Sequence, residues 1–144
     1  SMIDLPALYD FAAQRSIDVY WFSLDAAESL SYMDTDGTCY IAVDPWCLRT
    51  LADEKTKLAH ELGHCETGSF YNRYAKVDLR QKHENRADKW AIRQLVPEDT
   101  LDQAVADGYT DLPSLAEHFG VTESFMRKAV CWYTHGNLAA DLYT

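Results

Sequence analysis

The segment "LAHELGHCETGSF", from Leu58 to Phe70, contains two histidines with the spacing H-E-x-x-H. On a helix, His60 and His64 would project from nearly the same side, so that both imidazoles can bind one ion. Zinc suits two neutral imidazole nitrogens and one carboxylate, with a fourth position left open for water. Glu61 would lie beside the ion without binding it, close enough to take a proton from that water. The pattern therefore predicts a catalytic zinc site.

A third ligand must come from another segment, and the stretch "HENRADKWA" offers Glu84 and Asp88. These carboxylates are four residues apart and would share one helix face. We expect Glu84 to bind the ion and Asp88 to accept a hydrogen bond from the N–H of one liganding imidazole. Without the upstream motif, this stretch would be interpreted as a solvated helix with its own ion pairs. Three other residues remain open as alternative ligands: Glu66, Asp78 and His83.

A hydrolase also needs a donor that stabilises the oxyanion formed beside the metal. Candidate donors fall between the two helices that carry the motifs, and a packing or surface role fits each of them at least as well. They are Tyr71, Tyr74 and His83.

The helices that must position these residues can be predicted from their periodicity and end signals. A capping box beginning at Thr50 and an apolar stripe predict a helix that ends near Gly68. A second helix is predicted over 82–96, before Pro97. Gly63 lies in the middle of the first helix, where a glycine costs about 1 kcal/mol relative to alanine. This cost indicates that a backbone or a substrate approaches closely there.

The N-terminal part predicts a short helix capped by Asp4, then strands at 17–22 and 38–43. The second of these strands would form a hairpin with the residues before it, through a turn at 34–37, and would end before Pro45. Three short helices are expected further on, at 98–108, 111–120 and 122–136. We therefore predict one α+β domain over 1–144, with a small antiparallel sheet and the active-site helices in about 17–97 and a helical part in about 98–144.

The charge of the chain limits its partners. A net charge of -10, from 13 Lys+Arg and 23 Asp+Glu, repels phosphate backbones and argues against a dedicated nucleic-acid binder. The same charge suits a basic protein partner, although solubility alone also accounts for it. No apolar run is long enough to cross a membrane, and no secretory leader is evident, so we expect a cytoplasmic protein.

The cysteines support the same location. They form no C-x-x-C pair, and their spacing does not suggest the disulfide framework of a small secreted domain; they are Cys39, Cys47, Cys65 and Cys131. We expect reduced, buried thiols. Cys65 follows His64 directly, so a metal ligand or a redox switch remains the alternative interpretation for that thiol.

The two helical motifs together resemble those of the ImmA/IrrE metallopeptidases, which are found in mobile elements and bacterial stress regulators. The resemblance covers roughly 17–130 and rests on "KLAHELGHCETGSFYN" and "ENRADKWAIRQLVP". The matching positions are His60, Glu61, Leu62, Gly63 and His64, followed by Glu84, Ala87, Asp88, Trp90, Ala91, Leu95, Val96 and Pro97.

This resemblance implies a zincin-like (gluzincin) endopeptidase with Zn²⁺ held by His60, His64 and Glu84 and with Glu61 as the catalytic base. It also implies a helix-turn-helix repressor, often encoded on a prophage or integrative element, as the protein that is cut. The strand at 38–43 is then a hypothetical docking site for the target segment by strand addition.

Two other functions remain to be weighed. The first is a repressor-binding module (an anti-repressor) in which the metal only holds two helices together. The second is direct DNA binding through 115–130, which resembles a helix-turn-helix. Only Arg127 and Lys128 are basic in its would-be recognition helix, so we interpret the segment as a packed helical pair and expect no direct binding of nucleic acid.

Overall fold

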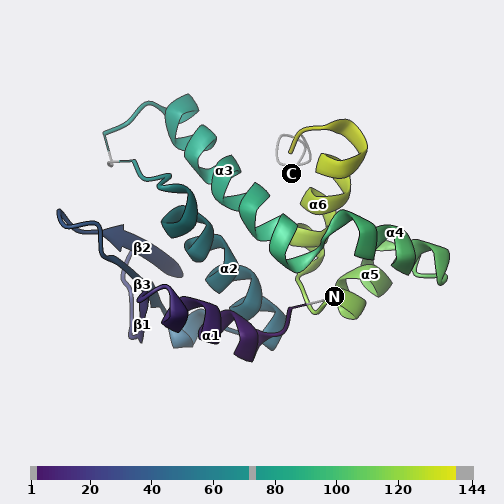
Figure 1. Cartoon of the computed structure of the whole chain (residues 1–144), viewed down its shortest axis with the longest axis horizontal. Helices are drawn as coiled ribbons and strands as arrows, with labels where there is room; N and C mark the ends of the chain where they lie inside the picture. Colours follow the sequence, from purple (N-terminus) through teal and green to yellow (C-terminus); the bar gives the residue numbers. More distant parts are fainter. Residues whose placement is uncertain (1–2, 72–73, 139–144) are drawn as a thin grey trace.

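The computed structural model describes residues 3–71 and 74–138. Its helices are α1 (Leu5–Gln14), α2 (Leu51–Thr67), α3 (Val77–Leu95), α4 (Glu98–Ala106), α5 (Leu112–Phe119) and α6 (Glu123–His135), with a 3-10 turn, η1, at Pro45–Cys47. Its strands are β1 (Asp18–Trp21), β2 (Ser29–Met33) and β3 (Cys39–Val43). The sheet, α1 and α2 form one end of the molecule, α3 crosses the middle, and α4 to α6 form the other end (Figure 1). The α+β class is confirmed.

We had expected a wholly antiparallel sheet, but the sheet is mixed. Its strand order is β1-β3-β2, with β2 antiparallel and β1 parallel to β3. The hairpin prediction for β2 and β3 is confirmed, including the turn, where Gly37 has a φ of 88°. The segment between β1 and β2 passes over the end of β3, where the Asp44 carboxylate accepts a hydrogen bond from Leu24 N.

The sheet order corrects one functional hypothesis. Because β3 is central, both of its edges are occupied by its neighbours, and it has no free edge for a substrate strand. The hypothesis that 38–43 binds the target by strand addition is therefore wrong. β2 is an edge strand instead.

The two motif helices have the ends that their sequences require, with one exception. At the start of α2 the Thr50 hydroxyl accepts a hydrogen bond from Asp53 N, and at its end Gly68 adopts the left-handed conformation with a φ of 65°. α3 ends at Leu95, close to the predicted end, but begins at Val77 rather than Lys82. Its N-cap makes no side-chain hydrogen bond, so no capping signal marked this end.

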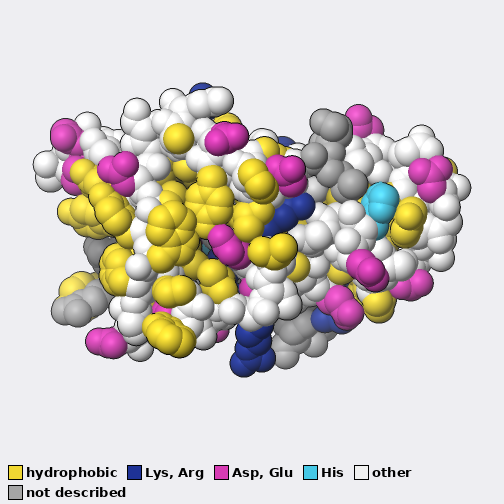
Figure 2. Space-filling model, turned by 90° about the horizontal axis from the view of Figure 1, so that it is seen from below, with side chains coloured by type: hydrophobic (Ala, Val, Ile, Leu, Met, Phe, Trp, Pro, Cys, Tyr) yellow, Lys and Arg dark blue, Asp and Glu magenta, His cyan; other side chains and the backbone are white. Residues whose placement is uncertain are grey.

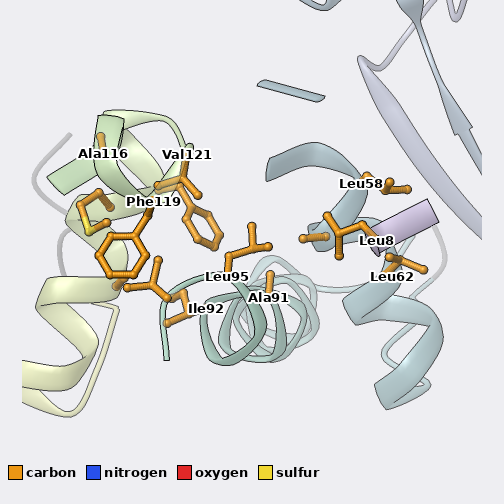
Figure 3. Packing of buried hydrophobic residues seen from close by; sticks show 14 of the residues in the cluster. Leu8, Leu58, Leu62, Ala91, Ile92, Leu95, Ala116, Phe119 and Val121 are labelled. Atoms are coloured by element: carbon orange, nitrogen blue, oxygen red, sulfur yellow. The ribbon is translucent and has the colours of Figure 1, made fainter. Parts of the chain in front are cut away.

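One hydrophobic core joins the sheet end of the molecule to the C-terminal helices. Figure 3 shows α3 at its centre, with residues of α1 and α2 on one side and residues of α5 and the turn after it on the other. The labelled residues are Leu8, Leu58, Leu62, Ala91, Ile92, Leu95, Ala116, Phe119 and Val121. The single domain over 1–144 stays a prediction, because 1–2, 72–73 and 139–144 lie outside the described residues. Among the helices described, none is long and apolar enough to cross a bilayer.

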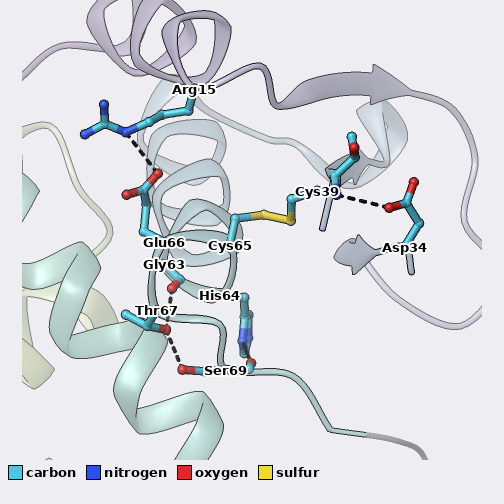
Figure 4. Close-up of a disulfide and its surroundings, with 10 residues drawn as sticks. Arg15, Asp34, Cys39, Gly63, His64, Cys65, Glu66, Thr67 and Ser69 are labelled. Atoms are coloured by element: carbon cyan, nitrogen blue, oxygen red, sulfur yellow. Dashed lines mark hydrogen bonds and ion pairs between the residues drawn. A yellow bond between two sulfur atoms is a disulfide. The ribbon is translucent and has the colours of Figure 1, made fainter. Parts of the chain in front are cut away.

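Two of the cysteines are not the reduced thiols that we expected. Cys39 in β3 and Cys65 in α2 form a disulfide, with their Cα atoms 6.0 Å apart (Figure 4). Cys47 and Cys131 are free. The bond joins the central strand to the helix that carries the H-E-x-x-H motif. Since disulfides are uncommon in the cytosol, this bond removes the support that the cysteines gave to a cytoplasmic location.

Large apolar side chains are exposed at the sheet end of the molecule. Figure 2 shows hydrophobic side chains gathered over the half that holds the sheet and α1, with acidic side chains mostly around them. In and next to the strands, the exposed large side chains are Tyr20, Trp21, Phe22, Leu30, Tyr32 and Trp46. Exposed apolar patches of this kind are typical of surfaces that contact other proteins.

Candidate metal centre

The metal centre that the sequence predicts lies where α2 crosses α3. His60 and His64 are on the face of α2 that meets α3, and Gly63 lies directly against the backbone of Ala87, whereas Glu61 faces Ser29 of β2. The absence of a side chain at Gly63 lets the helices approach until the carboxylates of α3 reach the imidazoles of α2. The position of Gly63 in mid-helix indicated that a backbone or a substrate comes close, and here it is the backbone of α3.

Three of the predicted donors converge on one point. The ligand atoms of His60, His64 and Glu84 all lie within 4.8 Å of one another. One oxygen of the Glu84 carboxylate is 2.7 Å from His60 Nε2, and the other is 3.2 Å from His64 Nε2. Two imidazoles and one carboxylate are the donor set of catalytic zinc sites, so these residues fit that ion.

Each histidine is held in place through its other ring nitrogen. His60 Nδ1 donates to Asp88 Oδ1 at 2.7 Å. His64 Nδ1 donates to the carbonyl of Ser69, which the left-handed turn at Gly68 brings back beside the helix (Figure 4). Such bonds fix the tautomer of an imidazole and leave its Nε2 available to a metal ion.

The electrostatics of the donor cluster favour a cation. Burial lowers the pKa of His60, but the hydrogen bonds to Asp88 and Glu84 outweigh it and raise that pKa to about 10. Burial raises the pKa of Glu84, yet its hydrogen bonds with His60 and His64 hold it well below its usual range. The carboxylates that raise the pKa of this imidazole would equally attract a divalent ion held between the same groups.

Glu61 is buried next to the donors and is not one of them. Its Oε2 accepts a hydrogen bond from the Ser29 hydroxyl of β2 at 2.7 Å. It lines a groove of about 820 Å³ that runs along β2 and also includes His60, His64 and Glu84. A carboxylate in this position can exchange a proton with a water or a substrate in the groove.

A second pocket continues from the groove on the other side of His60. Its volume is about 400 Å³, and it lies between α2, α3 and α6. The two cavities share Ser29, Lys57, His60 and Glu84. The two cavities together leave room for an extended peptide to lie across the donor cluster.

The structure separates the three candidate oxyanion donors. Tyr71 lines the groove, and its hydroxyl donates to Glu84 Oε1 at 2.8 Å. His83 stacks on Tyr71, with 6.1 Å between ring centroids. Tyr74 is 80% exposed in the loop before α3. Burial and the bond to Glu84 raise the pKa of Tyr71 to about 12, so its hydroxyl keeps its proton at neutral pH.

The alternative ligands do not join the cluster. Glu66 forms an ion pair with Arg15, and Asp78 accepts a hydrogen bond from Leu79 N at the start of α3. Among the described residues, the only group arranged to hold a metal is that of His60, His64 and Glu84.

Three residues of this site were not predicted from the sequence. They are Ser29, which binds Glu61, Ser69, whose carbonyl binds His64, and Lys128, which forms an ion pair with Asp88 at 3.1 Å. A serine or a main-chain carbonyl carries no signal in a single sequence. Lys128 was noticed only as a basic residue of a would-be recognition helix.

A buried H-E-x-x-H helix that meets a glutamate from the next helix beside the edge of a small sheet is the arrangement of a metallopeptidase-like domain. Comparison with known families agrees: residues 12–130 match the peptidase family described as the IrrE N-terminal-like domain (Peptidase_M78), and the chain belongs to this family. The predicted resemblance is thereby confirmed. A search of curated proteins found no significant match.

Proposed function

We propose that the protein is a zinc-dependent endopeptidase that makes one specific cut in a helix-turn-helix transcriptional repressor of a prophage or integrative element. The observation that carries the proposal is the convergence of His60, His64 and Glu84 beside the buried carboxylate of Glu61, in a groove along an edge strand. Membership of a peptidase family supports a protein substrate. The repressor follows from the family resemblance, and the net charge of -10 suits a basic partner of this kind.

His60, His64 and Glu84 would hold the zinc ion, which would supply a Lewis acid able to lower the pKa of water and polarise the peptide carbonyl. Glu61 accepts the proton of the attacking water and hands it to the leaving amine. The Ser29 hydroxyl, 2.7 Å from Glu61, orients this carboxylate toward the groove. The Tyr71 hydroxyl donates to the oxyanion that forms at the carbonyl.

The substrate binds along β2 as an additional strand. β2 lies at the edge of the sheet, and the loop before it and its first residues line the groove. Main-chain hydrogen bonds to such an edge hold a peptide extended, and alternate side chains of the peptide point into the groove. The exposed Leu30 and Tyr32 of β2 offer apolar contacts to these side chains.

The test is intact-mass analysis of a helix-turn-helix repressor encoded beside the gene of this protein, after incubation with the zinc-loaded protein. Wild type should yield two fragments from one cut, and Glu61→Gln should yield none while it still binds zinc. Glu66→Gln is the matched control, because Glu66 lies on the same helix, pairs with Arg15 and is outside the groove. Its cleavage should equal that of wild type. A Glu61→Gln protein that cuts at the wild-type rate would sink the proposal.

The alternative is an anti-repressor in which a structural metal holds α2 and α3 together. Structural zinc sites usually have four protein ligands, whereas three donors converge here among the described residues, and Glu61 has no purpose in such a site. Stable binding of the intact repressor by wild type and by Glu61→Gln, with no cut in either case, would favour the alternative.

A further inference from the structure

Lys128 of α6 connects the C-terminal helices to the metal centre. Its Nζ is 3.1 Å from Asp88 Oδ2, while Oδ1 of the same carboxylate is 2.7 Å from His60 Nδ1. The three side chains thus form a chain of charge-assisted hydrogen bonds that ends at a metal-binding imidazole. The Asp88 side chain is only 7% exposed, so protein groups rather than bulk water must hold it.

The position of this ammonium group depends on the core. α6 is fixed to the rest of the molecule by Phe125, Met126 and Ala129, which are all buried. Lys128 lies on the side of α6 that borders the pocket beside His60. Its neighbour Arg127 is exposed. One basic residue of the would-be recognition helix therefore faces the metal centre, which is a position unsuited to DNA contact.

Holding both carboxylate oxygens has a consequence for His60. A carboxylate bound through one oxygen can rotate about its terminal torsion, whereas one bound through both cannot rotate without breaking a bond. With Oδ2 held by Lys128, Oδ1 stays aimed at His60 Nδ1. This keeps the imidazole in the tautomer and orientation that present Nε2 beside Glu84.

We propose that Lys128 is a positioning residue of the metal centre: it holds Asp88, which in turn holds His60 ready to bind the ion. The C-terminal helix is then part of the metal centre, although neither motif includes it. The inference rests on the proposed function only in taking zinc as the ion, and its test requires no substrate.

The experiment measures the affinity of the full chain for Zn²⁺ alone, by competition with a chromogenic chelator. Lys128→Met, which keeps the length of the side chain but not its charge, should bind zinc about 10- to 100-fold more weakly than wild type, as is typical when a group that orients a ligand is lost. Lys128→Arg, which keeps a charged donor, should recover most of the affinity. Arg127→Met is the matched control on the same helix and should bind zinc like wild type.

A double-mutant cycle shows whether Lys128 acts through Asp88. In an Asp88→Asn background, adding Lys128→Met should change the affinity less than twofold, because the carboxylate that the lysine holds is gone. Loss of the same factor in both backgrounds would overturn the inference, as would an affinity of Lys128→Met within twofold of wild type. If Lys128→Met does not fold, Lys128→Gln takes its place under the same criteria. Failure of wild type to bind zinc would overturn the metal centre itself, which is a different result.

Discussion

Gly63 of α2 and Ala87 of α3 touch backbone to backbone: a Cβ built on Gly63 would lie 2.5 Å from the Ala87 carbonyl oxygen and 3.0 Å from its Cα. The contacted atoms are main chain and cannot move aside as a flexible side chain can. The contact brings Glu84 and Asp88, on either side of Ala87, to the imidazoles of α2. The spacing of the two helices, and hence the geometry of the donors, depends on a missing side chain.

Gly63→Ala should therefore be destabilising, even though alanine favours a helix by about 1 kcal/mol. Forcing an extra carbon into a packed contact costs about 1–3 kcal/mol and would push α3 away from α2. We expect a lower free energy of unfolding in urea and weaker zinc binding, because Glu84 moves with α3. A variant that is more stable than wild type and binds zinc equally well would show that the helices can separate without harm.

The relation between Gly63 and Ala87 also shows what one sequence can predict. The H-E-x-x-H spacing and the glycine together indicated a metal and a close approach, and the partner carboxylates could be chosen from their own helical spacing. Both ends of α2 carried recognisable capping residues, Thr50 and Gly68. Each of these features depends on residues close together in the chain, and such features can be predicted from one sequence.

The features that were missed depend on contacts between distant segments. Nothing in 17–22 shows that β1 pairs with β3 or that the two strands are parallel, because the residue pattern of one strand specifies neither its neighbour nor its direction. The Cys39–Cys65 disulfide forms because β3 packs on α2, and the spacing of two cysteines does not reveal this. The Ser69 carbonyl is different, because it lies only five residues from His64, but this bond uses the main chain, for which any residue type would serve.

The disulfide should contribute measurably to stability. Closing a loop with a sequence separation of 26 lowers the entropy of the unfolded chain by an amount worth about 3.5 kcal/mol. Replacing both Cys39 and Cys65 with alanine should lower the free energy of unfolding by about 2–4 kcal/mol in non-reducing buffer. Cys47→Ala and Cys131→Ala are the controls, because these cysteines are free. A reducing agent should bring wild type close to the double variant; identical unfolding curves with and without it would contradict the prediction.

Acid should weaken the protein partly through Asp44. Hydrogen bonds from Leu24 N and Trp46 N hold the pKa of this carboxyl below its usual value, although burial opposes them. A carboxyl with a lowered pKa adds stability above its ordinary pKa of about 3.9, and this contribution is lost as the pH falls through the lowered value. The stability difference between wild type and Asp44→Asn should thus be largest near neutral pH and should shrink in acid.

Urea unfolding of the two proteins at about pH 6.5 and about pH 3 measures this difference. Asp10→Asn removes the same charge from the exposed face of α1 and controls for the change in net charge. A difference between wild type and Asp44→Asn that stays constant, or grows, as the pH falls would contradict the assignment.

Tyr71 is the donor that we expect to stabilise the oxyanion, and Tyr74 provides its control. Tyr71 lines the groove with its hydroxyl 2.8 Å from Glu84, whereas Tyr74 is 80% exposed. Loss of one oxyanion donor costs about 10²- to 10³-fold in kcat. Tyr71→Phe should therefore lower kcat by about that factor with little change in KM, because the bond forms in the transition state. Tyr74→Phe should leave both constants unchanged.

Zinc affinity separates this role from a structural one. The Tyr71 hydroxyl also binds Glu84, so its loss could act by disturbing a ligand. If the role is catalytic, Tyr71→Phe keeps zinc affinity within a few-fold of wild type while kcat falls. If zinc affinity and kcat fall by the same factor, Tyr71 supports the ligand, and the oxyanion donor must be sought elsewhere, first at His83, whose ring stacks on Tyr71.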